Sequence, residues 1–292
     1  MRNATKAGLA LLIAGLVLSG AVYAASGFQF SRVASAQVYE PAQYRTDADG
    51  IGTLRFTLQD GGVEILPADG DEILFDYYQF DGERFSFSEK DGVLSVKTTP
   101  KQDWARAFRL GAFSGIADVM HDRLVVHLPN GFSGDLLIDS DNGQVKISEF
   151  AALSAVDIEV DNGSLKLEDL TCERLRTESE NGSVRLQSVK AAQADLESDN
   201  GSVRLFDCVF AQTLSVRSDN GPARFERLDG PNLSFDSDNG SVKGSVLGRE
   251  ADYQIVSDTK NGSSNLTSRL DRALDKQLVV RTDNGSVRVS WE

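Results

Sequence analysis

The residues with the clearest capacity for chemistry are acids that recur directly before an Asn-Gly pair. If the repeated units stack, neighbouring carboxylates lie about 4.8 Å apart and repel each other by roughly 1 kcal/mol in a water-like dielectric. Calcium takes carboxylate and carbonyl oxygens as ligands, so bridging calcium ions would relieve that repulsion. The candidate calcium ligands are Asp141, Asp161, Asp199, Asp219 and Asp238, with Glu180 and Asp283 at the same position of two further units.

The same acids have a simpler explanation as turn residues. Asp and Asn side chains satisfy backbone groups in turns whether or not a metal is present. The units differ from the nonapeptide calcium repeat, and Lys260 replaces the acid in one unit and interrupts the row. The turn role is therefore favoured over calcium, and the sequence indicates no other cofactor.

A second row of recurring charges is basic and follows each Asn-Gly pair. Such a row could track an anionic polymer, for example a teichoic acid or an acidic polysaccharide. The alternative is a solvated sheet face that is neutralised by flanking acids such as Glu159, Glu178 and Glu197 and discourages aggregation. The candidate ligand-binding bases are Lys146, Lys166, Arg185, Arg204, Arg224 and Lys243, and Arg288 continues the series.

These acids and bases belong to a repeat. Asn-Gly begins at positions 142, 162, 181, 200, 220, 239, 261 and 284, so the spacings are 19 to 23 residues. On both sides of each pair, apolar and polar residues alternate with the period of two that is typical of a β-strand. Each unit is therefore predicted to be strand, turn, strand.

Two folds fit this pattern. Asn-Gly is a strong hairpin signal, because both central residues of a type I′ turn need positive φ. In the alternative, a β-solenoid, each Asn-Gly pair is a corner and equivalent residues stack. A hairpin array would place Arg217 opposite Arg224, two like charges, and would not fix the repeat length. We therefore expect an all-β fold, a solenoid of ~20-residue Asn-Gly repeats.

The chain divides into four predicted parts. Residues 1–25 are a signal peptide or membrane anchor, because Arg2 and Lys6 precede an uncharged run over residues 7–25. That run can be cleaved or can stay in the membrane, and either outcome places the rest of the chain outside the cytoplasm. A linker over 26–41 leads to an N-terminal β portion over 42–130, and the Asn-Gly repeats occupy 131–292.

Two segments depart from the alternation. Residues 101–122 carry apolar residues at helical spacing, which fits a lid over a ligand groove or, preferably, a plug for the end or side of the stack. Between 249 and 276 the repeat lengthens, and a short helix is expected over 268–277.

Composition excludes several functions. The net charge of −14 argues against nucleic-acid binding, which requires a basic surface. Cys172 and Cys208 lie two units apart, about 9–10 Å at the spacing of stacked strands, whereas a disulfide needs Cα atoms within about 7 Å. The two histidines, His121 and His127, fall outside metal-ligand and nucleophile spacings, so no catalytic residue is predicted.

The arrangement of motifs resembles a known family. An exported anchor precedes Gly-Gly-Val-Glu-Ile-Leu at 61–66, Asp-Gly-Val-Leu-Ser-Val at 91–96 and Val-His-Leu-Pro at 126–129, and repeated Asp-Asn-Gly-Ser-Val-Lys/Arg-Leu units follow. This order is similar to the bacterial toastrack, or adhesin-like, β-strand repeat family over about residues 38–292. The resemblance implies a single-stranded right-handed β-helix outside the membrane, often linked to envelope stress, with no catalytic residues to carry over.

We therefore expect a non-enzymatic extracytoplasmic surface module, an adhesin or an envelope-stress-associated scaffold, whose partner is an envelope polymer or a surface protein. One alternative is a polysaccharide-acting β-helix enzyme, a lyase or hydrolase, which would need a cleft with acids from different units and a perturbed pKa. Another is a structural surface protein that self-associates through the C-terminal strand over 287–292.

Overall fold

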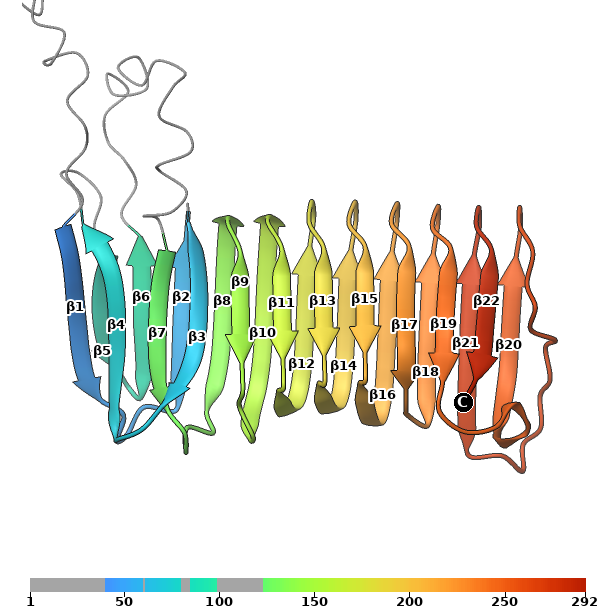
Figure 1. Cartoon of the computed structure of the whole chain (residues 1–292), viewed down its shortest axis with the longest axis horizontal. Helices are drawn as coiled ribbons and strands as arrows, with labels where there is room; N and C mark the ends of the chain where they lie inside the picture. The colour runs from blue at the N-terminus through green and yellow to red at the C-terminus, as the bar shows by residue number, and fades with distance from the viewer. Residues whose placement is uncertain (1–39, 60, 80–84, 99–122) are drawn as a thin grey trace, which may run out of the picture.

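Two facing β-sheets form an elongated stack (Figure 1). The computed structural model describes residues 40–59, 61–79, 85–98 and 123–292. Over these residues each sheet has eleven strands, and the only helix is one 3-10 turn, η1 (Glu250–Asp252). The expectation of an all-β fold is confirmed, and the long, mostly parallel sheets are consistent with a solenoid.

Within each sheet, the spatial order of the strands departs from their order along the chain. Sheet A contains, from one edge to the other, β1 (Glu40–Asp47), β4 (Glu72–Gln79), β7 (Arg123–Pro129), β3 (Gly62–Ala68), β9 (Val145–Ser148), β11 (Leu165–Glu168), β13 (Val184–Gln187), β15 (Val203–Phe206), β17 (Ala223–Leu228), β19 (Val242–Val246) and β22 (Val287–Trp291). Sheet B contains β20 (Tyr253–Thr259), β21 (Lys276–Thr282), β18 (Asn232–Ser237), β16 (Val209–Ser218), β14 (Lys190–Ser198), β12 (Thr171–Ser179), β10 (Leu153–Asn162), β8 (Asp135–Asn142), β2 (Thr53–Leu58), β6 (Val93–Thr98) and β5 (Phe85–Lys90).

Each Asn-Gly pair carries the chain from sheet B to sheet A. β12 ends at Ser179 in sheet B, and β13 begins at Val184 in sheet A after the turn at Asn181-Gly182. β14 and β15 repeat this path one layer, or rung, further along, in parallel register with β12 and β13. Because the strands that flank one turn lie in different sheets, the hairpin alternative is wrong.

The core lies between the two sheets and follows from the alternation. In β13, Val184 and Leu186 are fully buried, while Arg185 between them is exposed. The parallel register continues both inward rows into the neighbouring rungs, at Val203 and Leu205 in β15. Each rung therefore buries its apolar side chains against its neighbours, and the rungs stabilise one another.

At the C-terminal end, the order of the rungs in space differs from their order along the chain. After β19 the chain forms β20 at the outer edge of sheet B and then returns, so that β21 lies between β18 and β20. β22 accordingly pairs with β19. Lys260, which follows β20, therefore ends the row of acids. The prediction that it interrupts the row is wrong, and its Nζ lies 2.6 Å from Asp283 Oδ2.

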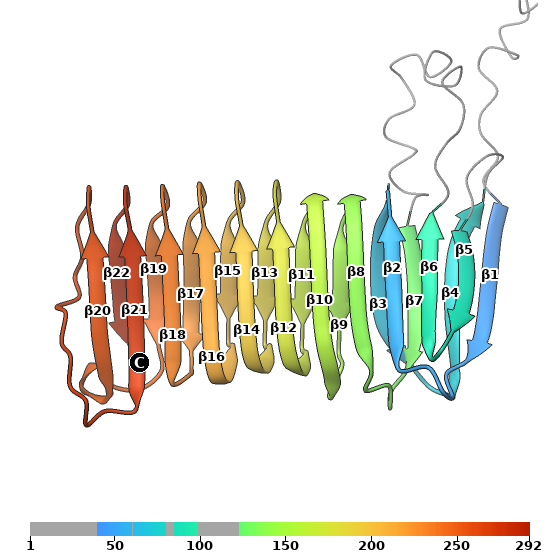
Figure 2. The ribbon, with the colours of Figure 1, turned by 180° about the vertical axis from the view of Figure 1, so that it is seen from behind.

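The N-terminal end shows a matching exchange, visible from both sides in Figures 1 and 2. β6 and β7 lie outside β2 and β3, so β8 pairs with β2 and β9 with β3. β1, β4 and β5 then close this end as antiparallel strands. The rings of Tyr44 and Phe87 stack with centroids 4.2 Å apart, and Tyr77 meets Phe85 at 5.1 Å, so aromatic side chains seal the core.

Residues 263–269 cover the sheet edges at the other end. On β22, Asn265 Nδ2 donates to the Val289 carbonyl at 2.8 Å, and Asn265 Oδ1 accepts from the Val289 N–H at 2.9 Å. On β20, Ser268 Oγ accepts from the Ser257 N–H at 3.0 Å and donates to its carbonyl at 3.1 Å. Leu266 is buried. We call these residues the C-terminal cap.

The C-terminal cap changes two sequence expectations. The short helix expected over 268–277 is not formed, and β21 begins at Lys276. The C-terminal strand β22 is also not a free edge, because Asn265 occupies it with the two hydrogen bonds that a neighbouring strand would make. Self-association through β22 would first require displacement of the cap.

Three expectations fall outside the described residues. They are the anchor over 1–25, most of the linker over 26–41, and the irregular segment 101–122. Within the ranges that the structure describes, no helix has the length and apolarity needed to cross a membrane.

Candidate functional site

The asparagines of the Asn-Gly pairs form a hydrogen-bonded ladder along the stack. Each Nδ2 donates to Oδ1 of the asparagine in the preceding rung at 2.9–3.1 Å. Asparagine suits this row because its amide is both donor and acceptor, so identical side chains can bond in series. In spatial order the ladder contains Asn162, Asn181, Asn200, Asn220, Asn239, Asn284 and Asn261.

The glycines are required by the close approach of successive turns. A Cβ on Gly201 would lie 1.5 Å from the carbonyl oxygen of Gly182, which belongs to the rung before it. None of the ladder asparagines has positive φ, and among the turn glycines only Gly143 does. The type I′ geometry that explains Asn-Gly in a hairpin is therefore not the cause of the motif in this chain.

A buried hydroxyl, which the sequence analysis missed, supports these turns. Ser218 Oγ accepts from the Gly221 N–H at 3.2 Å and donates to the Gly221 carbonyl at 2.9 Å. Ser237 Oγ accepts from the Gly240 N–H at 2.9 Å. The recurrence of Ser-Asp-Asn-Gly at 140, 198, 218 and 237 was the signal that could have revealed this row.

The acids lie in two adjacent columns, one at the turns that follow the strands of sheet B and one on the outer face of that sheet. The first column holds the calcium candidates. Backbone hydrogen bonds between successive turns align it: the Asn220 N–H, for example, donates to the Asp199 carbonyl of the preceding rung at 2.7 Å. The second column lies two residues upstream and has four consecutive acids: Asp139, Glu159, Glu178 and Glu197. Sheet B therefore carries a concentrated negative charge along one side.

Two carboxyl groups in the second column have raised pKa values. Burial raises the pKa of Asp139, and the charges of Asp141 and Asp161 raise it further. Burial also raises the pKa of Glu159, with added repulsion from Glu178 and Asp139. Both pKa shifts therefore come first from burial of the charged form, and the like charges of neighbouring rungs add to them.

The calcium candidates are placed in a line instead of around a point. Each of Asp141, Asp161, Asp199, Asp219 and Asp238 comes from a separate rung. In the described ranges, no group of three or more His, Cys, Asp or Glu side chains is arranged to hold a metal ion. Calcium binding by these aspartates stays a prediction without geometric support.

We expect Glu159→Gln to stabilise the protein at neutral pH. A carboxyl with a raised folded-state pKa binds its proton more tightly in the folded than in the unfolded chain, so stability falls as pH rises through the folded-state pKa. Removing the charge should raise the melting temperature at pH 7 by about 1–2 °C, the scale of a change below 1 kcal/mol. The gain should vanish near pH 3, about a unit below the ordinary glutamate pKa.

The control for this prediction is Glu173→Gln, which removes an exposed glutamate of β12 outside the two columns. Melting curves of both variants between pH 3 and pH 8 test the idea. An equal gain in the control, or a Glu159→Gln gain that persists at pH 3, would show that the buried and crowded charge of Glu159 is not the cause.

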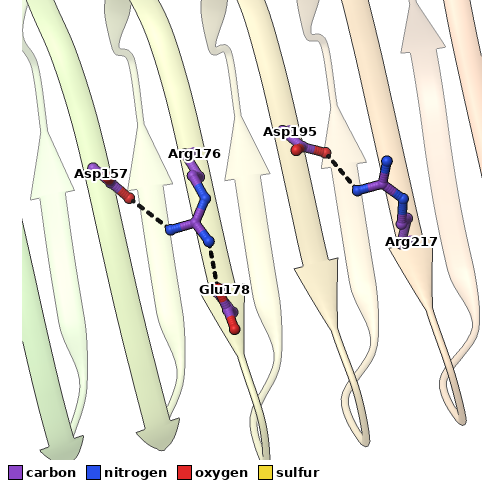
Figure 3. Close-up of polar contacts among 5 residues, drawn as sticks. All are labelled: Asp157, Arg176, Glu178, Asp195 and Arg217. Carbon is purple, nitrogen blue, oxygen red and sulfur yellow. Dashed lines mark hydrogen bonds and ion pairs between the residues drawn. The ribbon is translucent and has the colours of Figure 1, made fainter.

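The middle of sheet B has a shallow groove of about 480 Å³, and most of the charged side chains that line it are paired with one another. Figure 3 shows Arg176 between Asp157, at 3.3 Å, and Glu178, at 2.5 Å, while Arg217 lies 3.5 Å from Asp195. The hydrogen bond to Asp157 raises the pKa of Arg176. The pairs with Asp157 and Asp195 join neighbouring rungs, and the pair with Glu178 lies within β12. Most charges of the groove are therefore compensated within the protein.

The bases form one unbroken row on the outer face of sheet A. Parallel pairing aligns the six predicted residues and Arg288: Lys146, Lys166, Arg185, Arg204, Arg224, Lys243 and Arg288. The acids expected to neutralise this row, Glu159, Glu178 and Glu197, lie in sheet B. That expectation is wrong, because the solenoid places the two strands of one unit on opposite faces.

Only the N-terminal end of the base row is neutralised. Lys146 Nζ lies 2.9 Å from Glu64 Oε1, and Lys166 Nζ lies 2.8 Å from Glu168 Oε1. Among the described residues, no ion pair is made by the remaining five bases: Arg185, Arg204, Arg224, Lys243 and Arg288. A groove of about 540 Å³ runs along Arg185, Arg204, Arg224 and Lys243.

The cysteines and His127 have structural surroundings. Cys172 and Cys208 are free and buried, as the rung spacing predicts. Burial raises the pKa of the Cys172 thiol to about 12 and that of Cys208 to about 11, which disfavours the reactive thiolate. His127 Nε2 lies 3.2 Å from Asp76 Oδ2 across neighbouring strands of sheet A.

Together, the fold and its faces define a two-sheet parallel β-solenoid with an acidic outer face on sheet B and a basic row on sheet A. The sequence matches the Toastrack DUF4097 family model over residues 51–290, and the chain belongs to this family. The family prediction made from the motifs is confirmed. No curated protein matches the chain.

Solved structures with similar folds include two candidate adhesins. The one from Bacteroides fragilis NCTC 9343 is 13% identical, with 86% of this chain and 97% of that chain covered and a TM-score of 0.44. The one from Parabacteroides merdae ATCC 43184 is 10% identical, with 86% and 96% covered and a TM-score of 0.46. At such low sequence identities and TM-scores, the similarity gives no information about the function of this chain.

Proposed function

We propose that the protein is a non-enzymatic binding module of the bacterial envelope, displayed outside the cytoplasm as an adhesin or scaffold. Its ligand is an anionic envelope polymer that lies along the base row of sheet A. The observation that supports this proposal is the run of five bases, from Arg185 to Arg288, without ion-pair partners in the described residues.

An unneutralised row is costly unless a ligand uses it. Stacked like charges repel along the row, and the two columns of acids lie on the opposite sheet, where they cannot pair with these bases. A guanidinium presents a rigid fork of donors that matches a carboxylate or a phosphate, so the arginine positions among the five are suited to oriented anion contacts. An extended polymer could meet one base per rung.

The test is titration of the full chain with two polyanions, polygalacturonate and polyphosphate, at several salt concentrations. Binding should weaken with salt, because exposed charges are screened. The double variant Arg204→Gln/Arg224→Gln should lose at least about tenfold in affinity, or 1.4 kcal/mol. Both side chains are exposed, so the fold should be unaffected.

The matched control removes two exposed bases from sheet B, Arg174→Gln/Lys190→Gln. It changes the net charge by the same amount and should keep the parental affinity. An equal loss in both double variants would indicate a general charge effect, and failure of the parent to bind either polymer would rule the proposal out.

A further inference from the structure

We infer that the polymer is an anionic polysaccharide and that Phe206 contacts the face of its sugar rings. This inference rests on the proposed function and names the class of ligand that the same surface takes. It follows from the position of one exposed aromatic side chain and from the groups around it.

Phe206 is exposed on the face that carries the base row. The alternation of β15 places Arg204 and Phe206 outward, with Leu205 buried between them. The Phe206 side chain is 38% exposed, and Tyr78 and Leu270 are the other large apolar residues with comparable or greater exposure in the described ranges. A single exposed apolar residue is ordinary by itself, so its surroundings decide its meaning.

Those surroundings are the groove of sheet A. Phe206 lines it with Arg185, Arg204, Arg224 and Lys243, the bases without ion pairs. Within the described residues the Phe206 ring makes no aromatic or cation–π contact. The exposed Phe206 ring therefore lies in the same groove as bases without ion pairs. Ligand-binding sites commonly combine an apolar surface with a few polar groups in this way.

The chemistry of the groove favours sugars over a simple polyanion. A sugar ring has an apolar C–H face that can pack on an aromatic ring, while its hydroxyls need hydrogen-bond partners. Glu226, next to Phe206 across the rungs, and Ser290 also line the groove and supply such partners. The Glu226 carboxylate would repel a densely charged chain such as polyphosphate, but it can accept hydrogen bonds from hydroxyls.

The experiment compares Phe206→Ala and Phe206→Trp with the parent, using the full chain. Phe206→Ala should weaken polygalacturonate binding about tenfold and leave polyphosphate binding unchanged, because only the sugar polymer uses the ring. Phe206→Trp keeps an aromatic face and should retain the parental affinity. Far-UV circular dichroism and thermal melting check that each variant is folded, independently of any ligand.

Dextran sulfate, a sulfated glucan, tests whether the sugar rings or the carboxylate are recognised, because it keeps sugar rings and carries sulfate in place of carboxylate. Loss of affinity in Phe206→Ala for both sugar polymers would support an anionic polysaccharide irrespective of the acid group, and loss for polygalacturonate alone would restrict the class to uronates. Equal effects on polyphosphate, or no effect on either sugar polymer, would overturn the inference while the anionic-polymer function stands. If the parent binds no polyanion, the proposed function itself fails.

Discussion

Replacing Gly201 with alanine should strongly destabilise the middle of the stack. The new Cβ would lie 1.5 Å from the Gly182 carbonyl oxygen and 2.5 Å from its carbon. Both atoms are backbone, held by the stacked turns, so no flexible side chain can move aside. Relief requires the rungs to separate, which would stretch the Asn200–Asn181 side-chain bond of 3.0 Å and the bond of 2.9 Å from the Asn200 N–H to the Glu180 carbonyl.

The expected loss is on the order of 4 kcal/mol, the range of steric errors in tightly packed sites. For a domain of this size that corresponds to a melting temperature about 10 °C lower. Thermal unfolding followed by far-UV circular dichroism measures it. Because repeat arrays can unfold in parts, amide hydrogen exchange should show that the loss begins in the rungs around Gly201.

Gly131→Ala is the matched control. Gly131 lies in an exposed loop, has no positive φ, and would place its Cβ more than 4 Å from any neighbouring atom. The melting temperature of Gly131→Ala should stay within about 1–2 °C of that of the parent, because surface substitutions usually change stability little. A similar fall in both variants would mean that the close approach of the turns does not determine stability.

The rung architecture was predictable because the repeat length and the period-two alternation are local properties of the sequence. Once each Asn-Gly pair is a corner, parity alone assigns Arg185 to the outer face and Val184 to the core. The physical reason for the Asn-Gly motif could not be predicted from the sequence. Gly201 is needed for the approach of another rung and Asn200 for bonding to its equivalents, and both causes exist only after stacking.

The second corner of each rung had no sequence signal. Glu149, Asp169, Ser188, Asp207 and Arg227 all adopt positive φ there, at 49–66°, although they share no chemical type and none is glycine. Such a conformation costs an L-residue about 1–2 kcal/mol. The stacked backbone evidently imposes it, since neighbouring bonds such as Asp169 N–H to Gln187 carbonyl, 3.0 Å, continue from rung to rung.

The exchanges of rung order at the two ends were also beyond local reasoning. The lengthened repeat over 249–276 shows that something changes, but not that β21 inserts inside β20. The position of β21 depends on contacts between residues far apart in the sequence. The segment that connects β20 to β21 contains the C-terminal cap.

Asn265→Ala should uncover the edge of β22 and promote self-association. The Asn265 side chain satisfies both the N–H and the carbonyl of Val289, at 2.9 and 2.8 Å, in place of a neighbouring strand. Its removal leaves two peptide groups on an open edge, which is a template for pairing with another chain. We also expect a loss of about 1–3 kcal/mol in the free energy of unfolding, the range for partners left unpaired.

Sedimentation velocity over a concentration series measures the association, with Thr267→Ala as the control because Thr267 is an exposed residue of the same segment. Asn265→Asp should be intermediate, since a carboxylate can still accept from the Val289 N–H but cannot donate to its carbonyl. The parent and Thr267→Ala should sediment alike. If Asn265→Ala also matches them at every concentration, the side chain does not protect the edge. The backbone hydrogen bonds of Ser263 and Asn265 to Val287, together with Leu266 and Ser268, then hold the cap in place.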